Sequence, residues 1–372
     1  MRVGVPKEIK NHEYRVGLTP AAVRELCQRG HEVLIETQAG SGVGFEDQAY
    51  LEAGAVIVAS AEQIFADSDM VVKVKEPQPD ECKRLREGQC LFTFLHLAPD
   101  PVQAKLLAES NATCIAYETV TSSSGSLPLL APMSEVAGRM SIQAGAHHLE
   151  KAQGGNGTLL GGVPGVAPGK VLILGGGVVG ENAAQMAMGM GADVVILDRS
   201  LPRLRELDQR YGGRMKCVYS TAEAVEQYAF EADLVIGAVL IPGAAAPKLL
   251  RREHLARMKP GSVVVDVAID QGGCFETSKP TSHEKPTYVV DNVVHYCVSN
   301  MPGGVARTSS LALVNATMPF VLALADKGAV QALHDDVHLR NGLNVHKGHI
   351  TYRAVAEALH TPYVDPLDAL SM

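Results

Sequence analysis

The sequence predicts an α/β protein built from two doubly wound domains, and three observations support that prediction. The chain has 372 residues, about two and a half times the length of a typical domain. Short apolar runs alternate with helical segments in two separate series, as repeated βαβ units do. The turn-rich residues 122–132 and the glycine-rich residues 154–169 lie between the two series and mark a change of composition.

In the first series, the helix that follows the first strand has the clearest signals. Thr19 can cap its N-terminus, Pro20 occupies the first helical position, and Gly30 stands just past its C-terminus. The strands expected in this series are residues 2–5, 32–36, 55–58, 70–75, 90–95 and 113–117.

The second series follows a long alanine-rich helix that we expect to run from Ser134 to about Gln153. Six near-continuous apolar strands predict a parallel sheet covered by helices on both faces. The chain from about Thr308 onward is expected to be helical, and whether it packs back on the first domain stays open. The strands expected in the second series are residues 171–174, 193–197, 216–219, 233–239, 262–267 and 287–290.

Charge and composition exclude several classes of protein. The net charge is −8 and no Lys/Arg run occurs, so the chain is not expected to bind nucleic acid. Its first ten residues lack an apolar signal region, and the charge-free residues 308–325 contain Asn315, Thr317 and Pro319, which is typical of a buried, kinked helix rather than a membrane span. We therefore expect a cytoplasmic protein that does not bind a membrane.

The seven cysteines are scattered and never form a C-x-x-C pair, so we expect them to be reduced, without disulfides or a thiolate zinc site. Two histidines, His334 and His338, stand four positions apart, a spacing that can hold a metal. No acidic partner set or H-E-x-x-H motif accompanies them, and no metal site is expected.

A glycine motif, G-x-G-x-x-G at residues 175–180, opens the helix that follows the strand at 171–174. In this context Gly175 makes the tight turn, Gly177 lets a pyrophosphate approach the helix N-terminus, and Gly180 allows close packing of helix on strand. The next strand ends in Asp198, which can accept both ribose hydroxyls of an adenosine. The motif therefore predicts a dinucleotide site, and the alternative is a glycine turn without a ligand.

Asp198 also indicates which dinucleotide is bound. A carboxylate at this position repels a 2′-phosphate, which favours NAD over NADP, although Arg199 beside it introduces a positive charge.

Four polar residues are candidates for binding and ionising a substrate. Lys75 and His96 stand at the carboxyl ends of expected strands, where open α/β sheets bind ligands; the alternatives are a surface lysine and a core-edge histidine. Arg15 could bind a carboxylate through its planar fork, or be a surface cation. Asp270 precedes Gly272 and could be an acid or base, or a turn-capping aspartate.

Several segments together resemble the alanine dehydrogenase and pyridine nucleotide transhydrogenase family over nearly the whole chain. In the N-terminal third these are Gly4-Val5-Pro6-Lys7-Glu8, Glu13, Arg15-Val16, Thr19-Pro20, Gly30-His31 through Ala39-Gly40, Lys73-Val74-Lys75-Glu76-Pro77 and His96. Further along they are residues 175–180, 266–273 and 299–307.

The resemblance implies a function. It implies reversible, NAD-dependent oxidative deamination of L-alanine to pyruvate and ammonium by a homohexamer. It also implies that Arg15 and Lys75 bind the substrate carboxylate and carbonyl, and that His96 and Asp270 are the acid-base pair. Histidine fits such a role because it titrates in the useful range, and a cation that polarises a carbonyl contributes several kcal/mol in a transition state.

The resemblance further implies a domain order and a set of cofactor contacts. The substrate domain would comprise residues 1–128 and 305–372, with the Rossmann domain, residues 129–304, inserted in it. Lys279 stands where relatives often have Arg, which keeps the charge but loses bidentate geometry. Besides Gly175, Gly177 and Gly180, the implied cofactor-binding residues are Ser134, Val178, Val179, Asp198, Arg203, Ser220, Val239, Leu240, Val267, Ala268, Ile269, Asp270, Lys279, Val298, Ser299, Asn300 and Met301.

Two other functions share part of these features. The soluble NAD-binding subunit of a proton-translocating transhydrogenase has both family signatures but needs no alanine site, so Lys75 together with His96 argues against it. A non-catalytic NAD-binding regulator needs the glycine turn but not the four polar residues together.

Overall fold

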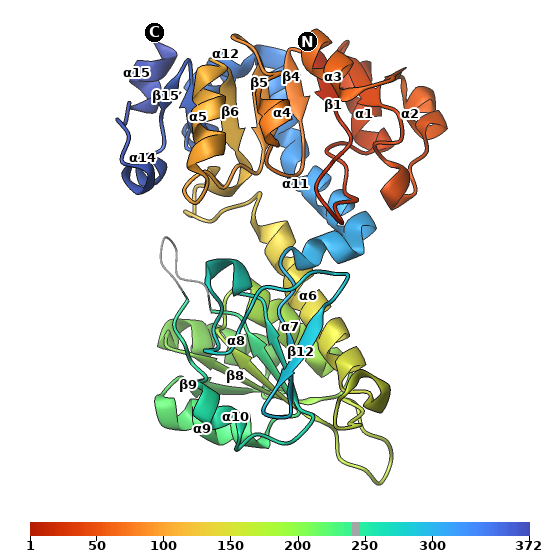
Figure 1. The fold of residues 1–372 in the computed structure, drawn as a ribbon, viewed down its shortest axis with the longest axis vertical. Coiled ribbons are helices and arrows are strands. Elements are labelled where there is room, and N and C mark those ends of the chain that lie inside the picture. Colours follow the sequence, from red (N-terminus) through yellow and green to blue (C-terminus); the bar gives the residue numbers. More distant parts are fainter. Residues whose placement is uncertain (240–245) are drawn as a thin grey trace. The chain divides into compact units, whose positions relative to one another are not determined.

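The computed structural model describes residues 1–239 and 246–372, which form two compact α/β units (Figure 1). Unit 1 consists of Met1–Met133 and Val305–Met372, and unit 2 consists of Ser134–Gly304. The chain thus leaves unit 1, forms unit 2, and returns to unit 1.

Unit 1 is built on an eight-stranded sheet with the strand order β15-β14-β6-β5-β4-β1-β2-β3. Strands β1 to β6, the first six along the chain, are parallel to one another. Strand β1 lies in the middle of these six, and later strands are added on both sides of it, which is the doubly wound arrangement. The parallel strands are β1 (Arg2–Val5), β2 (Glu32–Glu36), β3 (Val56–Val58), β4 (Met70–Val72), β5 (Cys90–Thr93) and β6 (Thr113–Ala116).

The connecting helices of unit 1 are α1 (Pro20–Gln28), α2 (Asp47–Ala53), α3 (Ala61–Asp67), α4 (Pro79–Cys82) and α5 (Pro101–Glu109). Helix α1 has the predicted ends: the Thr19 hydroxyl accepts a hydrogen bond from the Ala22 N–H, Pro20 is the first residue, and Gly30 has a φ of +83°. Glycine adopts this left-handed conformation at a helix end without the steric cost that a Cβ adds.

The C-terminal segment was expected to be wholly helical, and this prediction was wrong. After α11 (Ala306–Lys327), α12 (Ala329–Asp335) and α13 (Val337–Arg340) the chain forms two short strands, β14 (Leu343–His346) and β15 (His349–Ile350), then α14 (Arg353–Leu359) and α15 (Pro366–Leu370). Strand β14 pairs antiparallel with β6 and extends the sheet of unit 1. Its only apolar residues are Leu343 and Val345, and two alternate positions are too short a pattern to identify a strand.

Helix α11 is long and apolar enough to cross a membrane by length and composition. It is instead a core helix of unit 1, with Leu313, Val321 and Leu324 buried and with contacts to α1 and α12. Pro319 lies inside it, as predicted.

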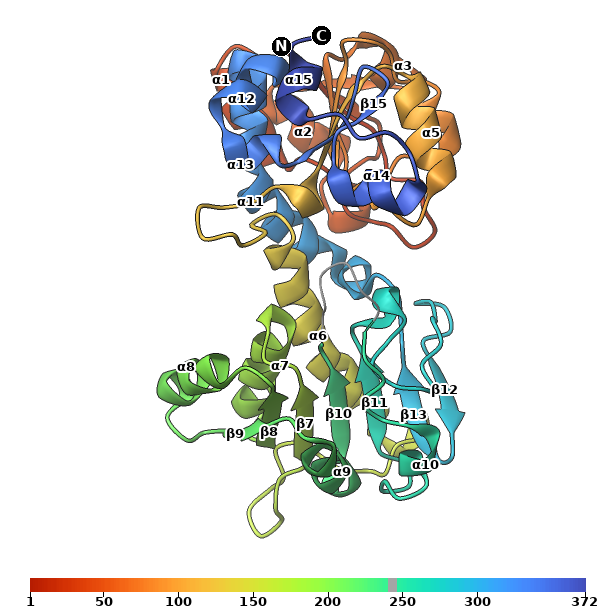
Figure 2. The same ribbon diagram turned by 90° about the vertical axis from the view of Figure 1, so that its left-hand side faces the viewer.

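Unit 2 contains a seven-stranded sheet with the order β12-β13-β11-β10-β7-β8-β9 (Figure 2). Alternate residues of β7 pack into opposite cores, Val171 and Ile173 on one face and Leu172 and Leu174 on the other. Both faces are therefore covered, as predicted. The strands are β7 (Lys170–Leu174), β8 (Asp193–Asp198), β9 (Lys216–Tyr219), β10 (Leu234–Gly237), β11 (Val263–Asp266), β12 (Thr287–Val290) and β13 (Val293–Tyr296), and the helices are α6 (Ala131–His148), which begins in unit 1, α7 (Val178–Gly189), α8 (Leu201–Tyr211), α9 (Ala222–Glu231) and α10 (Arg252–Leu255).

The prediction of an all-parallel second sheet was wrong at one edge. Strand β12 pairs antiparallel with β13, a strand that was not predicted. Asp291 and Asn292 connect the two strands, and both have positive φ angles, +48° and +62°. A two-residue loop with two left-handed residues is a hairpin turn, so this dipeptide was the missed signal.

Several other elements end earlier in the chain than predicted. Strands β4, β5 and β10 end two or three residues earlier than predicted, because the residues that follow them belong to loops at the carboxyl edge of the sheet. Helix α6 begins at Ala131 rather than Ser134, since Pro132 fits a first turn, and it ends at His148 before a short 3₁₀ turn.

Candidate active site

Both sheets have a topological switch point, where the strand order reverses. It lies between β7 and β10 in unit 2, and between β1 and β4 in unit 1. Open α/β sheets bind ligands outside the carboxyl ends of the strands at such a point, because the two loops there run in opposite directions and leave room. The predicted glycine motif and most predicted substrate residues lie in loops at these two places.

The glycine motif of unit 2 has the geometry of a phosphate-binding turn. Gly175 has a φ of +102°, and a Cβ there would lie 2.7 Å from the Ala238 carbonyl oxygen. A Cβ on Gly180 would lie 1.8 Å from the Gly175 carbonyl oxygen, so only glycine fits. At Gly177, the N-cap of α7, nothing lies within 4 Å of a Cβ position, and no side chain caps the helix. The first-turn N–H groups of α7, which include those of Val178 and Val179, can therefore receive an anionic group such as a pyrophosphate.

Asp198 ends β8 and closes over this turn. Its Oδ2 accepts a hydrogen bond from the Gly176 N–H at 2.6 Å, and its Oδ1 accepts one from the Ser200 N–H at 2.7 Å. Each carboxylate oxygen keeps a further lone pair that could accept a ribose hydroxyl. The residues present therefore fit a dinucleotide with a free 2′-hydroxyl.

Arg203 holds the same turn through a hydrogen bond to its backbone. Its Nε donates to the Gly176 carbonyl oxygen at 2.7 Å, and its other nitrogens form ion pairs with Glu181 and Glu206. Glu181 also binds Arg210 and the Tyr211 hydroxyl, and these contacts hold its pKa below its usual value against the opposing effect of burial. Glu181 was not predicted, since its partners lie 22 or more positions away.

Within the part of the chain that the structure describes, the other predicted cofactor residues lie in loops at the carboxyl ends of unit 2 strands or, for Ser134, in the first turns of α6. Ser220 follows β9 and donates its N–H to the Asp198 carbonyl oxygen at 3.0 Å, and Val239 follows β10. Leu240 lies outside the described residues. Lys279 is exposed and donates its N–H to the Tyr288 hydroxyl at 2.7 Å. Residues 267–270 follow β11, and residues 298–301 follow β13, which is parallel to β11.

A buried carboxylate, Asp266, shapes the loop that carries Asp270. It accepts hydrogen bonds from the N–H groups of Ala268 (3.1 Å) and Cys274 (2.8 Å) and from the Ser278 hydroxyl. Burial raises the pKa of Asp266. Asp270 itself lies exposed in the short 3₁₀ turn Ile269–Gln271.

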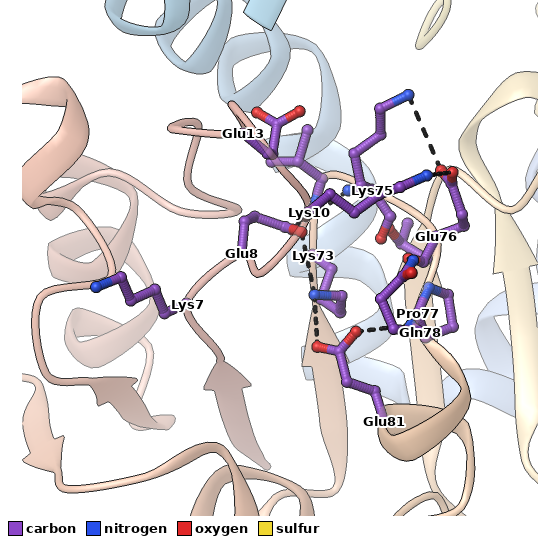
Figure 3. Close-up of polar contacts among 12 residues, drawn as sticks. Lys7, Glu8, Lys10, Glu13, Lys73, Lys75, Glu76, Pro77, Gln78 and Glu81 are labelled. Carbon is purple, nitrogen blue, oxygen red and sulfur yellow. Dashed lines mark hydrogen bonds and ion pairs between the residues drawn. The ribbon is translucent and has the colours of Figure 1, made fainter.

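In unit 1, a buried charge cluster joins the loops after β1 and β4 (Figure 3). Lys73 is fully buried between Glu8, at 3.2 Å, and Glu81, at 2.9 Å. Burial alone would lower the pKa of Lys73, but the two carboxylates outweigh it and raise the pKa. The other oxygen of Glu8 accepts the backbone N–H groups of Val74 (2.7 Å) and Lys75 (3.2 Å). The cluster thus fixes the backbone on which Lys75 stands.

Lys75 itself carries a partly exposed side chain, 20% accessible, beside Glu76. Its Nζ lies 3.9 Å from Glu76 Oε2, while Lys10 from the loop after β1 forms an ion pair with Glu76 Oε1 (Figure 3). Lys75 therefore differs from a free surface lysine, because a carboxylate and a second cation surround its ammonium group.

His96 lies directly after the predicted strand end and three residues beyond the observed end of β5, and it has a φ of +49°. Glu118 holds this left-handed backbone by accepting the His96 N–H at 2.6 Å, and the ring stacks on Phe94. A non-glycine residue in this region is strained and needs such support. Nδ1 of His96 lies 3.7 Å from Glu76 Oε2, so Lys75 and His96 share one carboxylate.

Arg15 is buried, which excludes the alternative of a surface cation. Its Nε and Nη2 bind the two carboxylate oxygens of Glu13 at 2.7 Å and 2.6 Å, and its Nη1 lies 3.2 Å from Met133 Sδ. Glu13 holds the fork in one orientation.

Within the described ranges, no group of three or more His, Cys, Asp or Glu side chains could hold a metal ion. His338 hydrogen-bonds through Nδ1 to the Thr121 hydroxyl at 3.0 Å, so its role is accounted for inside unit 1. All seven cysteines are free thiols.

These features define a dinucleotide-binding α/β protein with a second Rossmann-like unit that carries a charged site. Models of the family "Alanine dehydrogenase/PNT" match the chain in two parts, the N-terminal domain at residues 4–137 and the C-terminal domain at residues 141–353. The chain belongs to the alanine dehydrogenase/PNT family.

Individual relatives agree with the family models. The chain is 64% identical to an alanine dehydrogenase of Halomonas elongata over 365 residues, which cover 98% of each chain. A solved L-alanine dehydrogenase matches with a TM-score of 0.94 and 53% identity, over 97% of this chain and 99% of that one. A transhydrogenase from Sinorhizobium meliloti matches with a TM-score of 0.81 and 25% identity, over 95% of this chain and all of that one.

Proposed function

We propose that this protein interconverts L-alanine and pyruvate with NAD as the redox partner. In the oxidative direction L-alanine, NAD⁺ and water give pyruvate, ammonium, NADH and a proton. The observation that carries the proposal is that Arg15, Lys75 and His96 all lie in loops that follow neighbouring strands, β1, β4 and β5, at the carboxyl edge of the sheet of unit 1. The same chain has a complete dinucleotide turn in unit 2.

Each of these three residues, and Asp270 of unit 2, has a chemical role in this proposal. The buried, oriented fork of Arg15 binds the substrate carboxylate, because a planar guanidinium matches its two oxygens. Lys75 polarises the carbonyl oxygen of pyruvate in the reductive direction. His96 and Asp270 donate and accept the protons that imine hydrolysis and amine release require.

The cofactor role rests on unit 2. When bound, NAD supplies the acceptor for the hydride that leaves the alanine Cα. The α7 N-terminus holds its pyrophosphate, Asp198 binds its adenosine ribose, and Arg203 keeps the Gly176 turn in place. The predicted contacts from residues 267–270 and 298–301 belong to the same proposal.

The test is a spectrophotometric assay on the purified protein. We expect NADH formation that depends on both L-alanine and NAD, and NADH oxidation that depends on pyruvate and ammonium. D-alanine is the control, since its inverted Cα does not present the hydride to the same position. Absence of both reactions would overturn the assignment as an enzyme of alanine.

A transhydrogenase-type function predicts a different outcome. The lower identity to the solved transhydrogenase, 25% against 53%, favours the alanine reaction. Hydride exchange between NADH and an oxidised nicotinamide analogue, with no dependence on alanine or pyruvate, would support the alternative.

We also propose that the protein is a cytoplasmic homohexamer. Seven free cysteines suit a reducing compartment. The exposed apolar side chains Leu159, Val163 and Val166, on one glycine-rich arm, suit burial against further copies of the chain. Light scattering during gel filtration should give six times the chain mass of 39.4 kDa.

A further inference from the structure

Glu76 is the point at which the charged side chains of unit 1 converge. Lys10 forms an ion pair with its Oε1, while Lys75 Nζ and His96 Nδ1 lie 3.9 Å and 3.7 Å from its Oε2. These three partners come from the loops after β1, β4 and β5, which are adjacent strands. Figure 3 shows the lysine side chains of residues 10 and 75 both directed at the Glu76 carboxylate.

The carboxylate of Glu76 is largely buried, with 16% of its side chain exposed. Among the described residues, its Oε2 has no partner at hydrogen-bonding distance. A buried carboxylate oxygen without a hydrogen bond is costly, so it favours any small movement that brings a donor closer. The two donors within 4 Å are the ammonium of Lys75 and Nδ1 of His96.

The backbone of His96 restricts how its ring can respond. Glu118 binds the N–H groups of both Leu95 and His96, the His96 φ is +49°, and the ring is stacked on Phe94 at an interplanar angle of 15°. With the backbone and one ring face held, the nitrogen nearest a carboxylate is Nδ1. The other ring nitrogen, Nε2, is therefore the one that can exchange a proton with a substrate.

We propose that Glu76 is a positioning residue for the reaction: it accepts a hydrogen bond from the Nδ1–H of His96 and so makes Nε2 the atom that exchanges a proton with the substrate. The inference rests on the proposed function, because it assigns His96 an acid-base role. In the oxidative direction the Nε2 lone pair accepts a proton, Nδ1 keeps its own, and the resulting imidazolium lies against the Glu76 carboxylate. Glu76 itself gains and loses no proton.

The charges around the pair agree with this assignment. His96 faces Glu76, Glu118 and the ammonium of Lys75, and Glu76 faces His96, Lys75 and Lys10. Desolvation alone would lower the pKa of His96, but the hydrogen-bonding and charge contributions of the two glutamates outweigh it and raise the pKa. Desolvation alone would raise the pKa of Glu76, but His96, Lys75 and Lys10 hold it well below the usual value.

The experiment is Glu76→Gln, which keeps the shape and removes the charge. We expect a loss of about 10- to 100-fold in kcat, the scale known for removing the hydrogen-bond partner that orients a metal-ligating histidine. The acid limb of alanine oxidation should also move to lower pH, because the substitution removes a negative charge that raises the pKa of His96. The matched control is Asp80→Asn, an exposed carboxylate four residues away, which should leave both kcat and the pH profile unchanged.

A purely structural Glu76 would give a different result. The inference would be overturned if Glu76→Gln lost activity without a shift of the pH profile, or if it kept the wild-type kcat. Alanine oxidation by the wild-type protein would show that the proposed function is nevertheless correct. If the variant does not fold, nitrogen NMR of histidine-labelled wild-type protein decides, with the His96 signals assigned from His96→Gln. Protonation of neutral His96 at Nδ1 supports the inference, and protonation at Nε2 overturns it.

Discussion

The Arg15 guanidinium forms a two-point ion pair with the Glu13 carboxylate, Nε to Oε1 at 2.7 Å and Nη2 to Oε2 at 2.6 Å, and both side chains are almost fully buried. Two residues that are close in sequence thus fix a guanidinium in one plane before any ligand is present. A fork that is already oriented loses less rotational freedom on binding a carboxylate.

Arg15→Lys should therefore raise KM for alanine and pyruvate by about tenfold or more, since each lost charge-assisted hydrogen bond is worth about 1.5–3 kcal/mol. NADH affinity should not change, because the dinucleotide turn lies in unit 2. Steady-state kinetics together with NADH fluorescence titration measure both quantities. An unchanged KM would remove Arg15 from the substrate site.

Lys75→Ala should lower kcat by about 100- to 1,000-fold, the usual range for losing an electrostatic donor to a developing charge. The substitution leaves Glu8 bound to the backbone N–H of residue 75, so the loop should keep its shape. Stopped-flow measurement of NADH oxidation by pyruvate and ammonium gives the rate. The control is Lys83→Ala, a change at an exposed lysine further along the sequence, for which wild-type turnover is expected.

Asp198→Ala should weaken NAD binding and narrow the preference for NAD over NADP. The carboxylate oxygens accept the Gly176 and Ser200 N–H groups, so the variant loses loop contacts as well as ribose contacts. It also removes the charge that repels a 2′-phosphate. The ratio of kcat/KM for the two cofactors is the readout. If the ratio stays at its wild-type value, Arg199 or another loop sets the preference.

The features that sequence predicted are local ones. The capping residues of α1, the glycine turn and the alternation of strands and helices each occupy a few consecutive positions, so one stretch of chain is enough to identify them. The resemblance to a family then implied roles for residues such as Lys75 and His96, but it did not predict which residues contact them.

The partners of those residues could not be predicted because they come from distant parts of the chain. Glu8 binds the Lys75 N–H across 67 positions, and Glu118 binds the His96 N–H across 22. Glu8 stands in the quoted Gly4–Glu8 segment, but that segment does not indicate which residue Glu8 binds, and nothing in the local sequence of Glu118 distinguishes it from a solvated surface acid. Glu76 was within the quoted Lys73–Pro77 motif, and the role that we propose for it rests on the order of strands β1, β4 and β5, which brings its three partners together.

Lys73→Met should lower the free energy of unfolding by about 3–5 kcal/mol, the cost of removing one partner from a buried ion pair. It leaves Glu8 and Glu81 buried against each other without the ammonium that both bind at 3.2 Å and 2.9 Å. Urea denaturation followed by circular dichroism measures the change. Lys83→Met, on an exposed lysine, should stay within about 0.5 kcal/mol of the wild type. Equal stabilities of the two variants would show that the Lys73 cluster contributes nothing measurable.

The last prediction concerns His96 and Asp270, which the proposed function assigns to one acid-base pair. Asp270→Asn keeps the shape of an exposed side chain and should preserve the fold and most of the NADH affinity, while cutting kcat by about 100-fold or more. His96→Gln should also preserve the fold, because Glu118 still holds the backbone of residue 96. It should lower kcat to a similar extent, because the imidazole that exchanges the proton is lost. If the two residues act in the same proton transfer, the double variant loses much less than the product of the two single losses, since residues that act as a unit are not additive. The four rate constants, measured at one pH with saturating cofactor, form the cycle. Losses that multiply would mean that His96 and Asp270 act in separate steps.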